Sequence, residues 1–195
     1  MLGHDNEEKG NLLNAPETYM DKIAVSNKIP FEATDLDFSV EKNISPYTKA
    51  IMSIDIAGQS ADMEKLTQIS KKYNLKIISD TAQAPGALYK NQYAGTMSDV
   101  GGYSLNYHKH IHTGEGGILV TNDDEIAKKA FYLSTQAKDD PKLYIHNHVG
   151  YNFRLTNIQA AVGLAQLELL ESKLKKKKEI HLQYKKKIAT ILSIS

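Results

Sequence analysis

The stretch Ala50-Ile-Met-Ser-Ile-Asp-Ile-Ala-Gly-Gln-Ser-Ala-Asp-Met-Glu-Lys-Leu-Thr-Gln-Ile-Ser-Lys-Lys-Tyr-Asn-Leu-Lys-Ile-Ile-Ser-Asp80 decides the fold of this protein. Ala50–Ile56 is rich in isoleucine and predicts a strand, and Leu75–Ser79 predicts a second one. Between them, apolar residues recur at helical spacing over residues 63–73, and either Ser60 or Asp62 is expected to cap that helix. Two strands joined by one helix within about 30 residues predict a βαβ unit with parallel strands.

The pattern continues toward the C-terminus with two further strands and two further helices. Val100–Asn106 and Gly117–Thr121 predict strands, and residues 123–133 predict a helix. Residues 134–153 are expected to form a loop. Thr156–Leu192 then predicts one long helix, roughly 50 Å in length if it is unbroken. Alternating strands and helices predict an α/β fold with a mostly parallel sheet flanked by helices.

The composition is that of a soluble globular protein of one domain. The chain has 195 residues, of which 41% are hydrophobic and 24% charged, with a formal charge of +1. It has no cysteine, which excludes disulfides, thiolate nucleophiles and cysteine-ligated metals. No apolar run reaches the roughly 20 residues of a membrane span, and residues 1–10 lack the apolar core of a signal peptide. We therefore expect a cytoplasmic protein that does not enter a membrane.

Lysines gather in the second half of the last predicted helix, at Lys173, Lys175–Lys178 and Lys185–Lys187. Such a run could bind nucleic acid or an acidic membrane. Lysine runs on long helices are more commonly solvated faces, and the net charge of +1 provides no overall field for a polyanion. We expect neither nucleic acid nor membrane as a partner.

One lysine, Lys109, stands in a polar loop between the last two predicted strands. Asp80 follows an apolar strand, Gln83 comes three residues later, and Ser104 precedes Lys109 by five residues. Pyridoxal phosphate (PLP) chemistry needs a lysine for the aldehyde, an acid against the pyridine nitrogen and donors for the phosphate. Ligands of open α/β sheets gather at the carboxyl ends of the strands, where Asp80 is expected. Together these residues suggest a PLP site.

Each of these residues is ordinary when taken alone. A loop lysine is usually a surface residue, and an aspartate after a strand is often only a helix cap. His108, His110 and His112 alternate along the chain and could supply three nitrogen ligands to a metal. No neighbouring acid is available to orient them, so we do not expect a metal site.

Six ordered blocks carry a resemblance to a known family. They are Thr48-Lys-Ala-Ile51, Gly58-Gln-Ser-Ala-Asp-Met63, Ser79-Asp-Thr-Ala-Gln-Ala-Pro-Gly-Ala87, Ser98-Asp-Val-Gly101, Thr113-Gly-Glu-Gly-Gly117 and Gly150-Tyr-Asn-Phe-Arg-Leu-Thr-Asn-Ile-Gln-Ala-Ala161. With these blocks, residues 14–170 resemble the DegT/DnrJ/EryC1/StrS family of PLP-dependent nucleotide-sugar aminotransferases.

The resemblance implies a role for each candidate residue. Lys109 would form the Schiff base with PLP and move protons, and Asp80 would pair with the pyridine nitrogen. Gln83 would stack on the ring, and Ser104 would bind the phosphate. Asn152 would reach the phosphate of the neighbouring subunit's cofactor, which implies a homodimer. The residues alone favour a simpler interpretation of Asn152, as a turn residue before the long helix.

The fold implied is the large domain of the aspartate aminotransferase type (fold type I), in incomplete form. Residues 1–155 would form a partial PLP-binding domain, and residues 156–195 a long helix leading toward a missing small domain. The family's Gly-Thr phosphate loop would be missing as well. Asp55 stands where a histidine is common and Ala57 where an aromatic residue is common, so the early sheet region is the less typical part.

The activity implied is transfer of an amino group, from glutamate, to a keto group of a nucleotide-linked deoxysugar for cell-surface polysaccharide biosynthesis. Leu133–Asp140 with Tyr144-Ile-His146 further resembles members that act on sugars of the bacillosamine, legionaminic acid and perosamine pathways. Two alternatives stay open. One is a PLP-dependent sugar dehydratase, in which relatives carry histidine in place of the lysine. The other is an inactive remnant or one subunit of a split enzyme.

Overall fold

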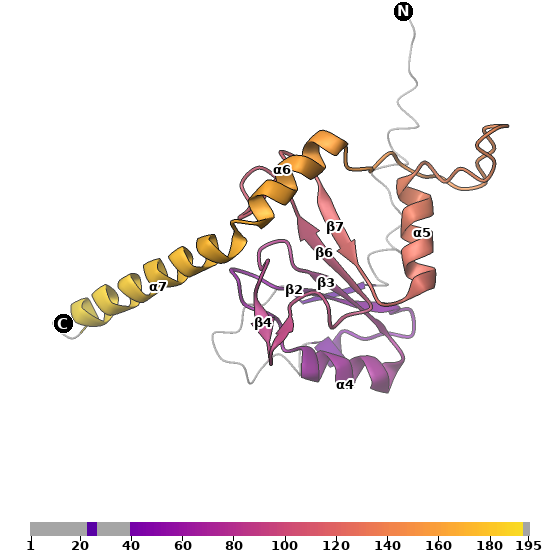
Figure 1. Cartoon of the computed structure of the whole chain (residues 1–195). Coiled ribbons are helices and arrows are strands. Elements are labelled where there is room, and N and C mark those ends of the chain that lie inside the picture. The colour runs from indigo at the N-terminus through magenta and orange to yellow at the C-terminus, as the bar shows by residue number, and fades with distance from the viewer. Residues whose placement is uncertain (1–22, 27–39, 193–195) are drawn as a thin grey trace, which may run out of the picture.

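The computed structural model describes residues 23–26 and 40–192, and its centre is a five-stranded sheet (Figure 1). The strand order is β1-β2-β3-β6-β7, and the first four strands are parallel while β7 runs antiparallel to β6. The bounds are β1 Ile23–Ser26, β2 Ala50–Ile54, β3 Lys76–Asp80, β6 Val100–Ser104 and β7 Gly117–Val120. The expected mostly parallel sheet is confirmed, and β1 is a strand that the sequence patterns did not indicate.

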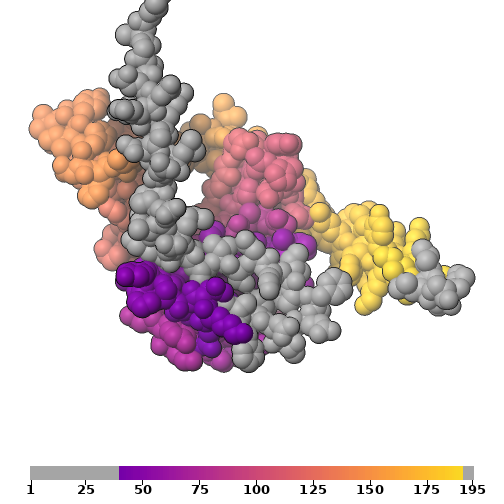
Figure 2. All heavy atoms as spheres, turned by 180° about the vertical axis from the view of Figure 1, so that it is seen from behind, coloured from indigo at the N-terminus to yellow at the C-terminus, as the bar shows by residue number. Residues whose placement is uncertain are grey.

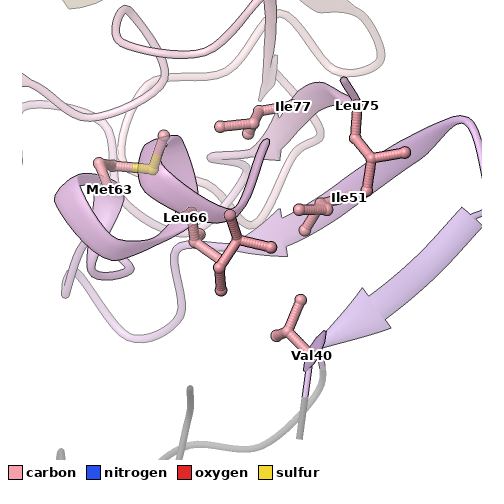
Figure 3. Packing of buried hydrophobic residues seen from close by; sticks show 7 residues of the cluster. Val40, Ile51, Met63, Leu66, Leu75 and Ile77 are labelled. Atoms are coloured by element: carbon pink, nitrogen blue, oxygen red, sulfur yellow. The ribbon is translucent and has the colours of Figure 1, made fainter. Parts of the chain in front are cut away.

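Helix α4 (Met63–Tyr73) connects β2 to β3 and completes the βαβ unit. Its apolar face packs on the two strands and forms the buried core (Figure 3). The members of this core are Val40, Ile51, Met63, Leu66, Ile69, Leu75 and Ile77. Asp62 is the N-cap, because its carboxylate accepts from the Lys65 N–H at 3.3 Å, whereas the Ser60 hydroxyl donates to the Ala61 carbonyl.

The register of the sheet aligns the carboxyl ends of its central strands. Ile54 of β2 pairs with Asp80 of β3, and Asp80 pairs with Gly102 of β6. Strand β2 ends two residues earlier than expected, because the Asp55 carboxylate accepts from the Ala61 N–H at 2.9 Å and turns the chain. The strands therefore end together at one edge, which we call the carboxyl edge.

Two smaller elements flank the sheet. A hairpin of β4 (Leu88–Tyr89) and β5 (Gln92–Tyr93) was not predicted, and the two residues of its turn have positive φ values, 47° at Lys90 and 66° at Asn91. Helix α5 (Asp124–Ser134) follows β7 as predicted. Asp123 caps α5 by accepting from the N–H groups of its first turn at 2.9 and 3.2 Å.

The single long helix predicted from Thr156 to Leu192 is wrong, since the structure has two helices there. Helix α6 (Asn157–Leu167) and helix α7 (Leu170–Leu192) meet at a turn, and their axes differ in direction (Figure 1). At the turn the Leu169 N–H donates to the Gln166 carbonyl, three residues back, so the helix tightens and ends. Neither proline nor glycine stands at the break, and the sequence therefore carries no signal for it.

Beyond its first turn, which contacts the rest of the protein through Lys173, helix α7 projects outward (Figure 2). On the opposite side, residues 136–151 form a projecting segment that we call the arm. No helix in the described ranges is both long and apolar enough to cross a membrane. The division of the chain at residues 155 and 156 stays a prediction, and residues 1–22, 27–39 and 193–195 lie outside the described part.

Candidate functional site

Asp80 is the last residue of β3 and lies at the carboxyl edge, where it is half-buried. Its Oδ1 accepts from the Ala82 N–H at 3.0 Å, which holds the side chain in a tight turn. Its carbonyl accepts from the Asp55 N–H at 2.8 Å and extends the pairing with β2 by one step. The carboxylate is therefore presented by the central part of the sheet rather than by a free loop.

Ser104 is the last residue of β6, the neighbouring strand. Because Asp80 pairs with Gly102, Ser104 lies two residues further along β6 and on the same face as Asp80. The strand spacing and rise place the two Cα atoms about 8 Å apart. The Ser104 Oγ accepts from the Asn106 N–H at 3.2 Å and retains its own proton for another acceptor. The sheet thus brings an acid and a hydroxyl together.

Gln83 lies beyond the end of β3 and is exposed. Its Oε1 accepts from the Ala57 N–H at 3.3 Å, in the turn that follows β2. Gln83 therefore lies on the β2 side of Asp80, while Ser104 lies on the β6 side. The three side chains extend along the carboxyl edge across three adjacent strands.

Lys109 lies in the loop that joins β6 to β7, which we call the lysine loop (residues 105–116). The loop begins and ends at the carboxyl edge, because Ser104 pairs with Gly117. Lys109 is half-buried, its N–H donates to the Asn106 carbonyl at 2.9 Å, and none of the described residues makes a hydrogen bond or ion pair with its amine. The amine is available for chemistry at this edge.

Asn106 anchors the turn before Lys109. Its amide group donates to both carboxylate oxygens of Glu115 at 2.9 Å, across the lysine loop. Its Oδ1 is buried and has no hydrogen-bond partner in the described part of the chain. The turn that carries Lys109 therefore contains a buried acceptor oxygen that is free to accept a hydrogen bond.

Asn152 is not brought together with the other four candidates. It pairs with Thr135 after α5, and its Oδ1 accepts from the Arg154 Nε at 3.4 Å. It lines an open groove of about 1310 Å³ between β7, α5 and the base of the arm. Neither Lys109, Asp80, Gln83 nor Ser104 lines this groove. Within one copy of the chain, Asn152 belongs to a separate surface.

In the described part of the chain, the three histidines of the lysine loop are not gathered as a set of metal ligands. Within residues 40–192, no group of three histidine, aspartate or glutamate side chains is placed to hold a metal ion. His108 stacks edge-on against Tyr107, with ring centroids 5.4 Å apart. Burial and the nearby charges of Lys177, Lys109 and Lys173 lower the pKa of His110. The carbonyls of His110 and His112 accept hydrogen bonds from the helices that follow.

A buried pair of side chains beneath Asp80 was not predicted. Asp55 is 1% exposed and Thr81 is fully buried, and the Thr81 hydroxyl donates to Asp55 Oδ2 at 2.6 Å. Burial, followed by the charge of Asp55, raises the pKa of Tyr103. Gly95 lies against this pair with φ 83°, and a Cβ there would meet the Thr81 hydroxyl at 2.7 Å. An aspartate directly after a buried strand was the available signal.

The residues at the carboxyl edge fit PLP. A carboxylate and a hydroxyl on adjacent strands suit a ring nitrogen and a phosphate, and an unpaired amine suits an aldehyde. The buried and unpaired Oδ1 of Asn106 leaves an acceptor for a further polar group at the same place. Lys109, Asp80, Ser104 and Gln83 are therefore the residues that would hold the cofactor.

Comparison with known proteins gives a family for the chain. A model of the DegT/DnrJ/EryC1/StrS aminotransferase family matches residues 34–194. The GDP-perosamine synthase of Escherichia coli O157:H7 is 40% identical over 155 residues, which are 80% of this chain and 43% of the relative. The GDP-perosamine synthase of Caulobacter vibrioides is 40% identical over 78% of this chain and 41% of its own.

Solved structures agree with these matches. PseC of Helicobacter pylori, an aminotransferase involved in the biosynthesis of pseudoaminic acid, superposes with a TM-score of 0.72 and 36% identity. The superposition covers 77% of this chain and 41% of PseC, so the chain spans less than half the length of the relatives that it matches. The fold is that of the fold type I, PLP-dependent aminotransferases, in partial form. This chain belongs to the DegT/DnrJ/EryC1/StrS aminotransferase family.

Proposed function

We propose that the protein is a PLP-dependent aminotransferase that moves an amino group from glutamate to a keto group of a nucleotide-linked deoxysugar, for cell-surface polysaccharide biosynthesis. The observation that carries the proposal is the register of β3 and β6, which pairs Asp80 with Gly102 and so places Ser104 two residues further along, on the same face and beside the lysine loop. The GDP-perosamine synthases and PseC support the class of substrate. A cytoplasmic location stays a prediction.

Each residue at the carboxyl edge has one task in this proposal. Bound PLP supplies an electron sink for bonds at the substrate carbon. Asp80 would accept a hydrogen bond from the ring nitrogen and keep it protonated. Ser104 would donate to the phosphate, and Gln83 would cover one face of the ring. Lys109 holds the cofactor through its amine and moves protons at the substrate, a general acid–base contribution of about 10²–10⁴-fold.

Lys109→Ala tests the proposal directly. Wild-type protein mixed with PLP should develop the visible absorbance of lysine-bound PLP, and Lys109→Ala should abolish it. Reduction with borohydride followed by mass spectrometry should locate the label on Lys109. The matched control is Lys49→Ala, an exposed lysine whose replacement should leave both signals unchanged. Lysine-bound PLP that persists in Lys109→Ala would contradict the assignment.

Asp80→Asn tests the acid at the ring nitrogen. This variant should still bind PLP through Lys109 but should lose most turnover, because a neutral amide holds the ring proton less firmly than a carboxylate. Product analysis with a nucleotide-linked keto sugar and glutamate separates amino transfer from dehydration. An unaminated, dehydrated sugar as the main product would favour the dehydratase alternative.

The homodimer is part of the proposal, because Asn152 lies apart from the other candidates within one copy. Its neighbours Tyr151 and Phe153 stack at 5.0 Å, and Phe153 is 75% exposed. An exposed aromatic pair beside Asn152 suits contact with a second copy of the chain. Asn152 of one copy would then contact the phosphate held by Ser104 of the other.

A mixing experiment tests this arrangement. Lys109→Ala and Asn152→Ala should each retain PLP poorly when studied alone. A mixed dimer contains one complete site, with Lys109 from one copy and Asn152 from the other. Mixing the two variants should therefore restore part of the PLP retention. Absence of restoration in verified mixed dimers would exclude the cross-subunit role of Asn152.

A further inference from the structure

The lysine loop is held from outside by three polar side chains of α6 and α7. Each one donates a hydrogen bond to a main-chain carbonyl of the loop. The pairs are Gln159 Nε2 to Glu115 O at 3.1 Å, Gln166 Nε2 to His112 O at 3.1 Å, and Lys173 Nζ to His110 O at 2.9 Å. We call these three side chains the clamp.

The spacing of the clamp makes it a single stripe along the helices. Gln159, Gln166 and Lys173 are seven residues apart, which is about two helical turns. All three are half-buried, unlike the exposed majority of α6 and α7. The Lys173 amine also donates to Gln166 Oε1 at 3.1 Å, so the stripe continues across the break between the helices.

The clamp grips the loop immediately after Lys109. The His110 carbonyl that receives the Lys173 amine belongs to the next residue along the chain. On the other side, the Lys109 N–H donates to the Asn106 carbonyl at 2.9 Å. The main chain around the amine is therefore held on both sides of Lys109, and the anchor at His110 comes from α7, outside the sheet.

We propose that Gln166 and Lys173 are positioning residues for Lys109, which fix the lysine loop from the helices that follow it. In the described part of the chain, neither side chain is hydrogen-bonded to Lys109, Asp80, Gln83 or Ser104; they bond to the carbonyls of His112 and His110 and to each other. They restrict the conformations that the loop can adopt, so less conformational entropy is lost when Lys109 reacts. The inference rests on the proposed function only for the role of Lys109, whereas the restraint on the loop is independent of PLP.

Gln159 is left out of the test for a structural reason. It forms a capping box with Thr156, in which the Gln159 N–H donates to the Thr156 hydroxyl at 3.2 Å and Gln159 Oε1 accepts from the Thr156 N–H at 3.1 Å. Replacing Gln159 would weaken the start of α6 as well as the clamp. Gln166 and Lys173 take part in no capping box, and in the described part of the chain their only other side-chain hydrogen bond is the one that joins them to each other.

Hydrogen exchange of the full chain tests the restraint without any cofactor. Gln166→Leu and Lys173→Met should each speed the exchange of amides at residues 106–113 by about tenfold, because each variant loses a hydrogen bond to the loop. Lys173→Arg keeps a cationic donor and should retain most of the protection. Exchange in α4, which packs on the distant core, should not change.

Two matched variants control for charge and side-chain size. Lys175→Met and Gln183→Leu make the same replacements at exposed positions of α7 and should leave exchange in the lysine loop unaltered. Equal exchange of the loop in wild type, Gln166→Leu and Lys173→Met would overturn the inference. The same holds if the control variants loosen the loop as much as the clamp variants do.

The rate at which PLP becomes attached to Lys109 gives a second readout. The clamp variants should attach PLP about 10- to 100-fold more slowly than wild type, because small displacements of a reacting group have large kinetic effects. A loosened loop with an unchanged attachment rate would refute positioning and leave the proposed function intact. If wild type attaches no PLP, the proposed function fails for this chain. Hydrogen exchange then remains as the test of whether Gln166 and Lys173 restrain the lysine loop.

Discussion

The βαβ region (residues 50–80) and the helical region (residues 124–192) use their apolar side chains differently. In the βαβ region, Ile51 is fully buried, and Met63 and Ile77 are 2% and 3% exposed. In the helical region, neither α5 nor α6 buries a residue, and Ile158 and Leu164 of α6 are 80% and 62% exposed. The first region closes a core of its own, whereas α6 is held on the rest of the molecule largely by polar contacts such as the clamp.

A substitution in the core of the βαβ region should have the largest effect on stability. Ile51→Ala should lower the free energy of unfolding by about 2–5 kcal/mol, because it leaves a cavity in a fully buried position. Leu164→Ala, at an exposed position of α6, should change it by less than about 0.5 kcal/mol. Urea denaturation followed by circular dichroism measures both values. Equal losses in the two variants would break the comparison.

A substitution in the buried pair of Asp55 and Thr81 should have the next largest effect on stability. Asp55→Ala should cost about 3 kcal/mol, because it leaves the buried Thr81 hydroxyl and the half-buried Ala61 N–H without their acceptor. Asp55→Asn keeps one acceptor oxygen and should cost less. The control is Asp124→Ala, an exposed residue in the first turn of α5, for which a change below about 1 kcal/mol is expected. If Asp55→Ala unfolds like the control, the pair contributes little.

The difference between the two regions also explains what could be predicted from the sequence. The βαβ unit was predicted because burial imposes a period on the side chains, which the isoleucine run from Ala50 and the helical spacing from Met63 both record. The break at residues 168 and 169 was not predicted. It depends on tertiary contacts of α6 and α7, and exposed helices carry little periodic signal of where they end.

The candidate site also has a part that the sequence predicts and a part that it does not. Asp80 and Ser104 could be placed near each other because parallel strands end at a common edge. The contacts that hold the neighbouring backbone, namely the Asp55–Thr81 bond and the clamp, could not be predicted. The link between Asp55 and Thr81 joins residues 26 apart in the chain, and the link between Lys173 and His110 joins residues 63 apart. Such contacts depend on the register of the sheet and on helix direction, neither of which a local pattern encodes.

Acid should affect the central sheet, where Asp99 is bonded to β3, differently from the arm, which contains Asp139. Burial alone would raise the pKa of Asp99, but hydrogen bonds from the Lys76 amine and the Ile77 N–H outweigh burial and lower it. A lowered pKa in the folded state stabilises the protein above the ordinary value of about 4, and this stabilisation is lost as the pH falls through the folded value. Asp99→Asn should therefore flatten the loss of global stability below about pH 4.

Asp139 should report only on the arm. The hydrogen bond from the Asn147 N–H at 2.6 Å, followed by that from the Tyr132 hydroxyl, lowers the pKa of Asp139 despite some desolvation. The pKa of Asp139 is shifted in the same direction as that of Asp99, so the arm should loosen as the pH falls below about 4. The protection of the Asn147 amide, which is the slowing of its exchange relative to that of an unfolded chain at the same pH, should fall there in wild type and be low at all pH values in Asp139→Asn. A matching change in global unfolding would contradict the independence of the arm.

The smallest effect on folding is expected on the exposed face of α6. Ile158→Ser should change the free energy of unfolding by less than about 0.5 kcal/mol, because Ile158 is 80% exposed. It should nevertheless reduce association between copies of the isolated chain, since exposed apolar surface promotes contact. Sedimentation velocity over a range of concentrations measures this. Unchanged association together with a large loss of stability would show that Ile158 belongs to a core.

The antiparallel pairing of β6 and β7 has a consequence for the loop that carries Lys109. A parallel neighbour would need a crossover that carries the chain back to the other edge of the sheet, usually through a helix. The antiparallel neighbour lets the chain turn back where it left, so Ser104 and Gly117 face each other. The loop that carries Lys109 could thus be exchanged for another of similar length while both anchoring strands keep their pairing.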